Sequence, residues 1–101
     1  MSKTEEMVTC RTPTPGKSAK RIAKWKYDAV RDAILAVVPS EGEGLPLVQL
    51  SDRVERQLSG DVRAKLGSIL WYAITVKLNM EVEGELRRVP GSQPQRLLRA
   101  V

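Results

Sequence analysis

A long apolar segment, residues 66–84, constrains the fold of this chain more than any other stretch. Its apolar residues fall into two sets at helical steps of three and four. One set contains Leu66, Ile69, Ala73, Val76 and Met80, and the other contains Trp71, Ile74, Leu78 and Val82. Val76, Leu78 and Met80 also alternate as in a strand, but the pattern is much longer than a usual strand of about 5–6 residues. The segment therefore predicts an interior helix that is covered on two sides and ends at Gly84.

The same helix has one polar side, made by Ser68, Tyr72, Thr75 and Asn79. A helix with two covered apolar sides has only its remaining side in water. These four side chains are therefore expected to form an exposed polar edge.

The rest of the chain alternates between helical and extended patterns. The predicted elements are, in order, an N-terminal hairpin of residues 8–11 and 17–22, a helix over residues 25–38, a one-residue strand at Leu45, a helix opening at Pro46, a helix starting at Asp61 or Ser68, and a hairpin of residues 85–89 and 95–99. The expected fold class is α+β and mainly α: three helices, a C-terminal β-hairpin and an extended N-terminal arm or hairpin.

Composition limits the chemistry that the chain can perform. It has 101 residues, no histidine and one cysteine, Cys10. Serine–histidine and cysteine–histidine dyads, a Cys/His zinc site and an internal disulfide are therefore excluded. We expect no catalytic residue, no metal and no cofactor, and the chain is not expected to be an enzyme. The lone thiol, the polar N-terminus and the lack of a membrane-length apolar run predict a cytoplasmic protein without a membrane partner.

Basic residues are concentrated in the N-terminal part. The chain has 17 basic and 12 acidic residues and a net charge of +5. Between Arg11 and Arg31 lie seven basic residues and a single acid, Asp28. Such a run is compatible with a solvated arm or with phosphate contact, and charge alone does not distinguish them.

Two sets of residues carry resemblances to known families. Gly44-Leu45, residues 80–86 and the arginine-bearing hairpin resemble a winged helix-turn-helix domain over roughly residues 25–99. This resemblance implies a winged-helix-like domain at residues 25–101, while the polar composition of residues 1–7 predicts a disordered end and the basic pattern of residues 8–24 an extended arm or hairpin. Residues 14–17, 26–31 and 71–78 resemble a small bacterial family of uncharacterised proteins, which implies no activity.

The winged-helix resemblance implies that the third helix and the hairpin contact double-stranded DNA. The candidate DNA-binding residues are Lys17, Lys20, Arg21, Lys65, Ser68, Tyr72, Thr75, Asn79, Arg87, Arg88, Arg96 and Arg99. The polar side of the helix carries no arginine or lysine, although arginine to guanine is the commonest specific contact. Glu81, Glu83 and Glu85 are expected to be solvated and to repel phosphate near that end.

The alternative is a protein-interaction module, specifically a homodimer without a nucleic-acid role. Trp71 and Tyr72 are aromatic residues of the kind enriched at interfaces, although core packing is the competing interpretation for Trp71. Catalysis by the three glutamates is not expected, because residues two apart on a helix point away from each other.

Overall fold

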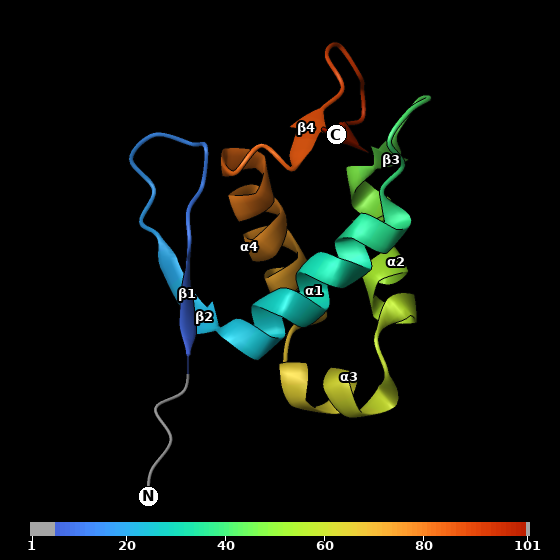
Figure 1. Cartoon of the computed structure of the whole chain (residues 1–101). Helices are drawn as coiled ribbons and strands as arrows, with labels where there is room; N and C mark the ends of the chain where they lie inside the picture. Colours follow the sequence, from blue (N-terminus) through green and yellow to red (C-terminus); the bar gives the residue numbers. More distant parts are fainter. Residues whose placement is uncertain (1–5, 101) are drawn as a thin grey trace, which may run out of the picture.

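The apolar segment forms the helix α4 (Ile69–Val82), which packs against α1 (Lys24–Val37) and α2 (Leu50–Gln57) (Figure 1). The computed structural model describes residues 6–100. The other elements are β1 (Met7–Cys10), β2 (Lys20–Ala23), β3 (Leu45–Pro46), the 3₁₀ turn η1 (Leu47–Gln49), α3 (Gly60–Leu66), β4 (Leu86–Arg88) and β5 (Arg96–Arg99). The α+β class, the N-terminal hairpin and the C-terminal hairpin are confirmed.

The described residues form four helices, and the expectation of three was wrong. One helix begins at Gly60, beside the predicted start Asp61, and another at Ile69, beside the predicted start Ser68, and a serine caps each of them. The hydroxyl of Ser59 accepts from the Val62 N–H at 3.2 Å and begins α3. The hydroxyl of Ser68 accepts from the Trp71 N–H at 3.1 Å and begins α4. Gly67 separates the two helices. Its φ is +99°, a backbone conformation that glycine adopts readily and residues with a side chain rarely adopt.

The strands form two small antiparallel sheets. β1 pairs with β2, and the second sheet has the order β3-β5-β4, with Leu45 opposite Leu97. A Cβ on Gly44 would lie 2.7 Å from the carbonyl oxygen of Leu97, so the entry to β3 requires glycine. Pro46 was expected to open the second helix. It instead pairs with Arg96 in β3, and α2 begins only after η1.

One hydrophobic core lies between α1, α2, α4 and the second sheet. Val30 and Ile34 of α1, Val76 and Met80 of α4, and Leu97 of β5 have no exposed surface. The first apolar set of α4 is therefore buried as expected, with Ile69 at its margin.

The second apolar set of α4 is only partly covered, contrary to the expectation of two covered sides. Trp71 and Val82 remain 43% and 40% exposed. The N-terminal hairpin lies instead against the polar side, where Asn79 is buried. Periodicity identified the apolar side correctly, but it does not determine which side a neighbouring element covers.

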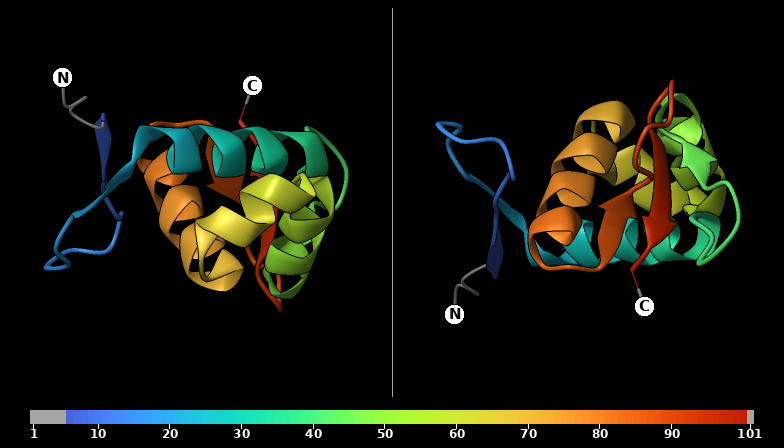
Figure 2. Two further views of the ribbon diagram at one scale, coloured as in Figure 1. Left: turned by 90° about the horizontal axis from the view of Figure 1, so that it is seen from below. Right: turned by 90° about the horizontal axis from the view of Figure 1, so that it is seen from above.

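The N-terminal hairpin stands beside the helical body and joins it through β2, which runs directly into α1 (Figure 2). Cys10 and Ile22 are each 3% exposed and anchor it to the core. Met7 lies in β1 and the Glu6 carbonyl accepts from the Lys24 N–H at 2.8 Å, whereas both residues were assigned to the disordered end. The rest of that end, residues 1–5, lies outside the described residues.

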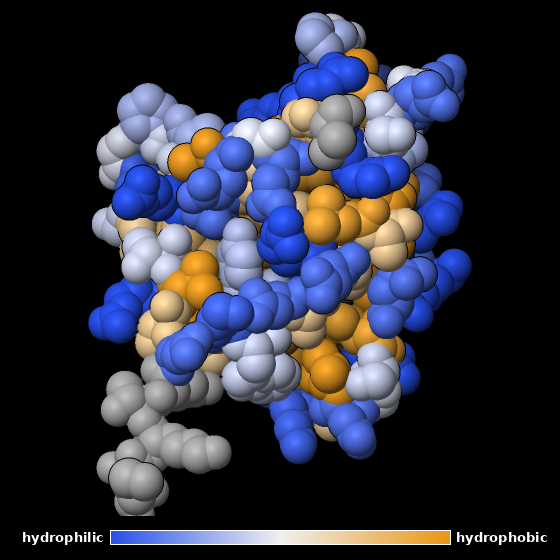
Figure 3. Space-filling view, viewed as in Figure 1, coloured by the Kyte–Doolittle hydropathy of each residue, from blue (hydrophilic) through white to orange (hydrophobic). Residues whose placement is uncertain are grey.

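The side of the molecule seen in Figure 1 is mainly hydrophilic, with small separate apolar areas (Figure 3). Within residues 6–100, none of the helices combines the length and the apolar character needed to cross a bilayer.

Candidate functional site: the two free sides of α4

The outer face of α4 is apolar and partly open to solvent. We define this face by Leu70, Trp71, Ile74, Leu78 and Val82, which recur at helical steps. Leu70 is 61% exposed, and Ile74 and Leu78 are partly exposed. In both views of Figure 2 the side of α4 turned away from α1 has no other described element on it. The face is therefore available to another molecule.

The polar side of α4 is largely occupied within the chain. Asn79 is 4% exposed. Its Oδ1 accepts from the Arg11 backbone N–H at 2.9 Å, and its Nδ2 donates to the Tyr27 hydroxyl at 2.9 Å. Asn79, a predicted DNA contact, therefore lies below the surface and holds the hairpin against α1.

The other predicted contacts on this helix also have internal roles. The Ser68 hydroxyl caps α4. Tyr72 is half-buried, and its hydroxyl accepts a hydrogen bond from Lys26 Nζ at 3.2 Å. Its ring packs edge-to-face against the Trp71 ring, with the two ring centroids 4.9 Å apart. Thr75 faces the hairpin, and Lys65 at the end of α3 is exposed.

Two of the three glutamates at the C-terminal end of α4, Glu81 and Glu85, bind cations of the fold, although all three were expected to be solvated. The Glu81 side chain is 7% exposed and accepts from Lys77 Nζ at 3.0 Å and from Arg88. Glu85 accepts from Arg31. Glu83 is exposed. Only Glu83 therefore presents an uncompensated carboxylate among these three.

Three of the four arginines of the C-terminal hairpin have partners within the fold. Arg88 binds Glu81, Arg96 Nη1 donates to the Gly44 carbonyl at 3.2 Å, and Arg99 Nε donates to the Val38 carbonyl at 2.8 Å. Arg87 is exposed and has no hydrogen-bond or ion-pair partner among residues 6–100. The hairpin thus offers one uncommitted guanidinium, although four were predicted.

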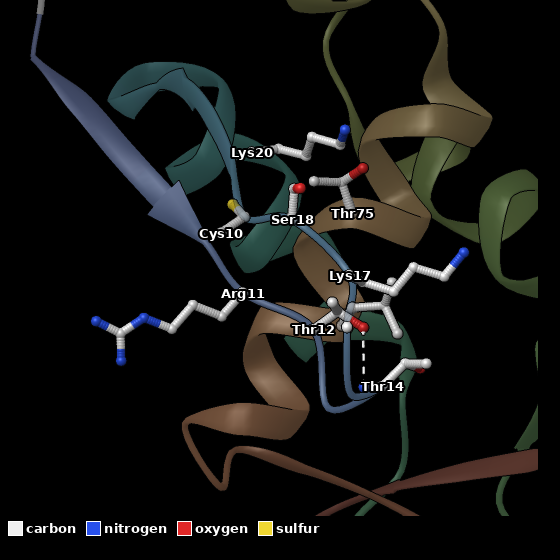
Figure 4. A pocket seen from close by; sticks show the side chains of 10 residues that line it. Cys10, Arg11, Thr12, Thr14, Lys17, Ser18, Lys20 and Thr75 are labelled. Carbon is white, nitrogen blue, oxygen red and sulfur yellow. Dashed lines mark hydrogen bonds between the residues drawn. The ribbon is translucent and has the colours of Figure 1, made fainter.

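A groove of about 530 Å³ lies between the N-terminal hairpin and α4 (Figure 4). It is lined by Cys10, Arg11, Thr12, Thr14, Gly16, Lys17, Ser18, Lys20, Thr75 and Leu78. The predicted contacts Lys17, Lys20 and Thr75 thus come together, while Arg21 is exposed on the same strand as Lys20. Sequence reasoning missed Arg11 and the hydroxyls of Thr12, Thr14 and Ser18, although all lie in or beside the predicted hairpin turn.

The described residues offer little for redox or metal chemistry. No group of three or more His, Cys, Asp or Glu side chains that could hold a metal occurs within residues 6–100. Burial raises the pKa of the Cys10 thiol to about 11. The thiol therefore stays protonated near neutral pH, where it is a poor nucleophile.

These features define a small α+β domain with two antiparallel sheets, one uncovered apolar helix face and one basic groove. The chain belongs to the family of unknown function DUF6958, whose model matches residues 7–97. This confirms the resemblance to an uncharacterised family. No curated protein and no solved structure shows a significant match to the chain.

Proposed function

We propose that this chain is a winged-helix-like assembly module that forms a homodimer through the outer face of α4. The observation that carries the proposal is the row of exposed and partly exposed apolar side chains on that face, with Leu70 and Trp71 in its first turn. Contiguous exposed apolar surface of this kind marks interaction sites, and tryptophan is among the residues that contribute most at interfaces.

A second copy is the occupant that fits this face best. A two-fold axis brings the same face of both molecules together, so one apolar row covers the other. Exposed charges flank the two ends of α4, with Lys65 before its first turn and Glu83 after its last. In an antiparallel pair of α4 helices, Lys65 of one copy approaches Glu83 of the other.

The winged-helix-like arrangement is supported by the connection order. A helix, a short strand, further helices and a closing hairpin follow one another, and the hairpin strand β5 lies between β3 and β4. In winged-helix proteins that bind DNA, the helix before the hairpin enters the major groove. Here the outer face of that helix carries no lysine or arginine, which favours a protein partner over base recognition.

Double-stranded DNA is the second candidate partner. It is favoured by the exposed cations Lys17, Lys20 and Arg21 on the N-terminal hairpin and by Arg87 on the C-terminal one. These groups would contact phosphates and would not read bases, so binding would be salt-sensitive and largely independent of sequence.

The dimer is tested by sedimentation equilibrium over a range of protein concentrations. We expect a monomer–dimer equilibrium that the double variant Leu70→Glu/Trp71→Ser shifts to monomer. Loss of a buried aromatic anchor costs about 2 kcal/mol or more, which corresponds to roughly 30-fold weaker association. Both positions are exposed in the monomer, so circular dichroism should show an unchanged fold.

Val48→Glu provides the matched control, because Val48 is an exposed apolar residue (77%) outside the outer face of α4. It should associate like the unmodified chain. A chain that stays monomeric at every concentration, or a Leu70→Glu/Trp71→Ser variant that still forms dimers, would contradict the proposal.

A further inference from the structure

The groove between the N-terminal hairpin and α4 has the size of a ligand site. Its volume of about 530 Å³ falls within the roughly 300–1,000 Å³ typical of small-molecule pockets. Residues from the hairpin turn form one wall, and Thr75 and Leu78 of α4 form the other (Figure 4).

The charge of this groove is entirely positive. Arg11, Lys17 and Lys20 contribute to its lining, and none of the described lining residues is a carboxylate. Elsewhere the fold pairs cations with acids, as in Lys77–Glu81 and Arg88–Glu81. The side chains of Lys17 and Lys20 make no hydrogen bond or ion pair within residues 6–100. Their charge is therefore available to an anion from outside.

Lys17, Ser18 and Lys20 lie on the wall that the hairpin contributes, and Thr75 lies on the wall that α4 contributes. Lys17 and Lys20 extend to the same side of the hairpin turn as Thr75, whereas Arg11 extends to the opposite side (Figure 4). Ser18 lies next to Thr75 in the same view. Ammonium groups and hydroxyl donors that line one groove match the several acceptor oxygens of a phosphate.

The groove is held in place by buried contacts at its base. Cys10 is buried, and the Arg11 backbone is bonded to Asn79, which in turn binds Tyr27. A ligand would therefore meet a preformed wall, which lowers the entropy lost on binding.

We propose that this groove binds a phosphate ester, held by Lys17 and Lys20 with the hydroxyls of Ser18 and Thr75. The volume exceeds that of a lone phosphate, and Leu78 offers an apolar surface to the rest of the ligand. The phosphate ester is that of a free mononucleotide or of a nucleic-acid strand, since both present the same group. The phosphate-binding residues Lys17, Ser18, Lys20 and Thr75 lie outside the outer face of α4, whereas Leu78 belongs both to that face and to the groove.

The test is a titration of the full chain at low salt, followed by heteronuclear NMR, with inorganic phosphate, adenosine 5′-monophosphate and a short DNA duplex as separate probes. We expect shifts at the amides of residues 16–20 and of Thr75. The variant Lys17→Ala/Lys20→Ala should weaken binding at least about tenfold, since charged hydrogen bonds are lost at exposed positions.

The matched control is Arg53→Ala/Arg56→Ala, which removes the same charge from exposed positions on α2. It should change affinity less than about twofold if binding is local. Thr75→Val tests the hydroxyl without altering charge and should also weaken binding. Binding of the mononucleotide identifies a free ester as ligand, and binding of the duplex alone identifies a nucleic-acid strand.

The proposal is overturned if no probe binds at low salt, or if the two double variants lose affinity equally, because diffuse charge would then suffice. The Leu70→Glu/Trp71→Ser variant separates the two proposals. It should bind the probe like the unmodified chain, whether or not the unmodified chain forms a dimer.

Discussion

Asn79 connects three parts of the chain through one side-chain amide. Its oxygen receives the backbone N–H of Arg11 in the hairpin, and its nitrogen donates to Tyr27 in α1. From the sequence it was placed on an exposed edge, because asparagine at helical spacing beside serine and threonine is typical of a solvated side. Its role depends on where the hairpin packs, and the spacing of residues along α4 does not show that.

Replacing Asn79 with leucine should destabilise the protein. The substitution leaves the buried Tyr27 hydroxyl without its partner, which costs about 1–3 kcal/mol, and also removes the partly buried bond from the Arg11 N–H. The free energy of unfolding, measured by urea denaturation, should fall by at least about 2 kcal/mol. Gln49→Leu is the control, because Gln49 is exposed and its side chain accepts a single hydrogen bond within residues 6–100, from Arg53 at 3.4 Å. Equal stability of the two variants would contradict this role for Asn79.

Cys10 should react slowly with thiol reagents in the native protein. Burial raises the pKa of its thiol from 9.0 to about 11, so the thiolate fraction near pH 8 falls about 100-fold. The rate of reaction with a disulfide reagent should therefore rise about 100-fold or more on unfolding in urea. A native rate equal to the unfolded rate would show that the thiol is accessible and ionised.

The same shift has a consequence for stability. The native chain keeps the thiol proton to a higher pH than the unfolded chain does, so the unfolded state binds fewer protons above about pH 9. The contribution of Cys10 to stability is therefore fully present below pH 9.0 and is lost as the pH rises toward about 11.

At the scale of single elements, α4 contains a nearly buried ion pair. The side chains of Lys77 and Glu81 are 3% and 7% exposed and lie one helical turn apart. Arg88 of β4 also binds Glu81, so the acid links the helix to the closing hairpin.

Glu81→Gln should destabilise the protein strongly, because it leaves the buried Lys77 ammonium without its counter-ion. Breaking a buried pair in this way typically costs about 3–5 kcal/mol, whereas an exposed pair contributes about 0–1 kcal/mol. The control is therefore Asp52→Asn, which breaks the exposed pair with Arg56. The stability of both variants is measured by thermal and urea unfolding. If Glu81→Gln lowers the free energy of unfolding no more than Asp52→Asn does, the prediction is contradicted, because the Lys77 ammonium must then be solvated in the variant.

Element types were largely predictable from local signals. The turn residues Pro15-Gly16 and Pro90-Gly91 identified both hairpins, and Leu45 identified the short strand. The division of the third helix into α3 and α4 depended on two serine caps on either side of Gly67. Asp61 and Ser68 were predicted as alternative starts of one helix, whereas a helix begins beside each of them.

At the scale of the whole molecule, the candidate sites depend on which neighbour covers which side. The sequence located the apolar and polar sides of α4 correctly but exchanged their exposure, because the position of the N-terminal hairpin depends on tertiary packing. Three of the predicted arginine contacts, Arg88, Arg96 and Arg99, are engaged inside the fold, because an acid or a carbonyl of a neighbouring segment reaches each of them. Lys17 and Lys20 remain accessible, since they lie in or beside a turn that projects from the body (Figure 1).

The order of the second sheet has a consequence for how the chain is made. The middle strand β5 comes from residues 96–99, whereas its neighbour β3 comes from residues 45–46. A polypeptide growing from its N-terminus therefore synthesises β3 long before the strand that pairs with it, and Leu97 joins the core last. Nascent chains that end after α4 lack that strand, so the native sheet assembles only once residues 96–99 have emerged from the ribosome.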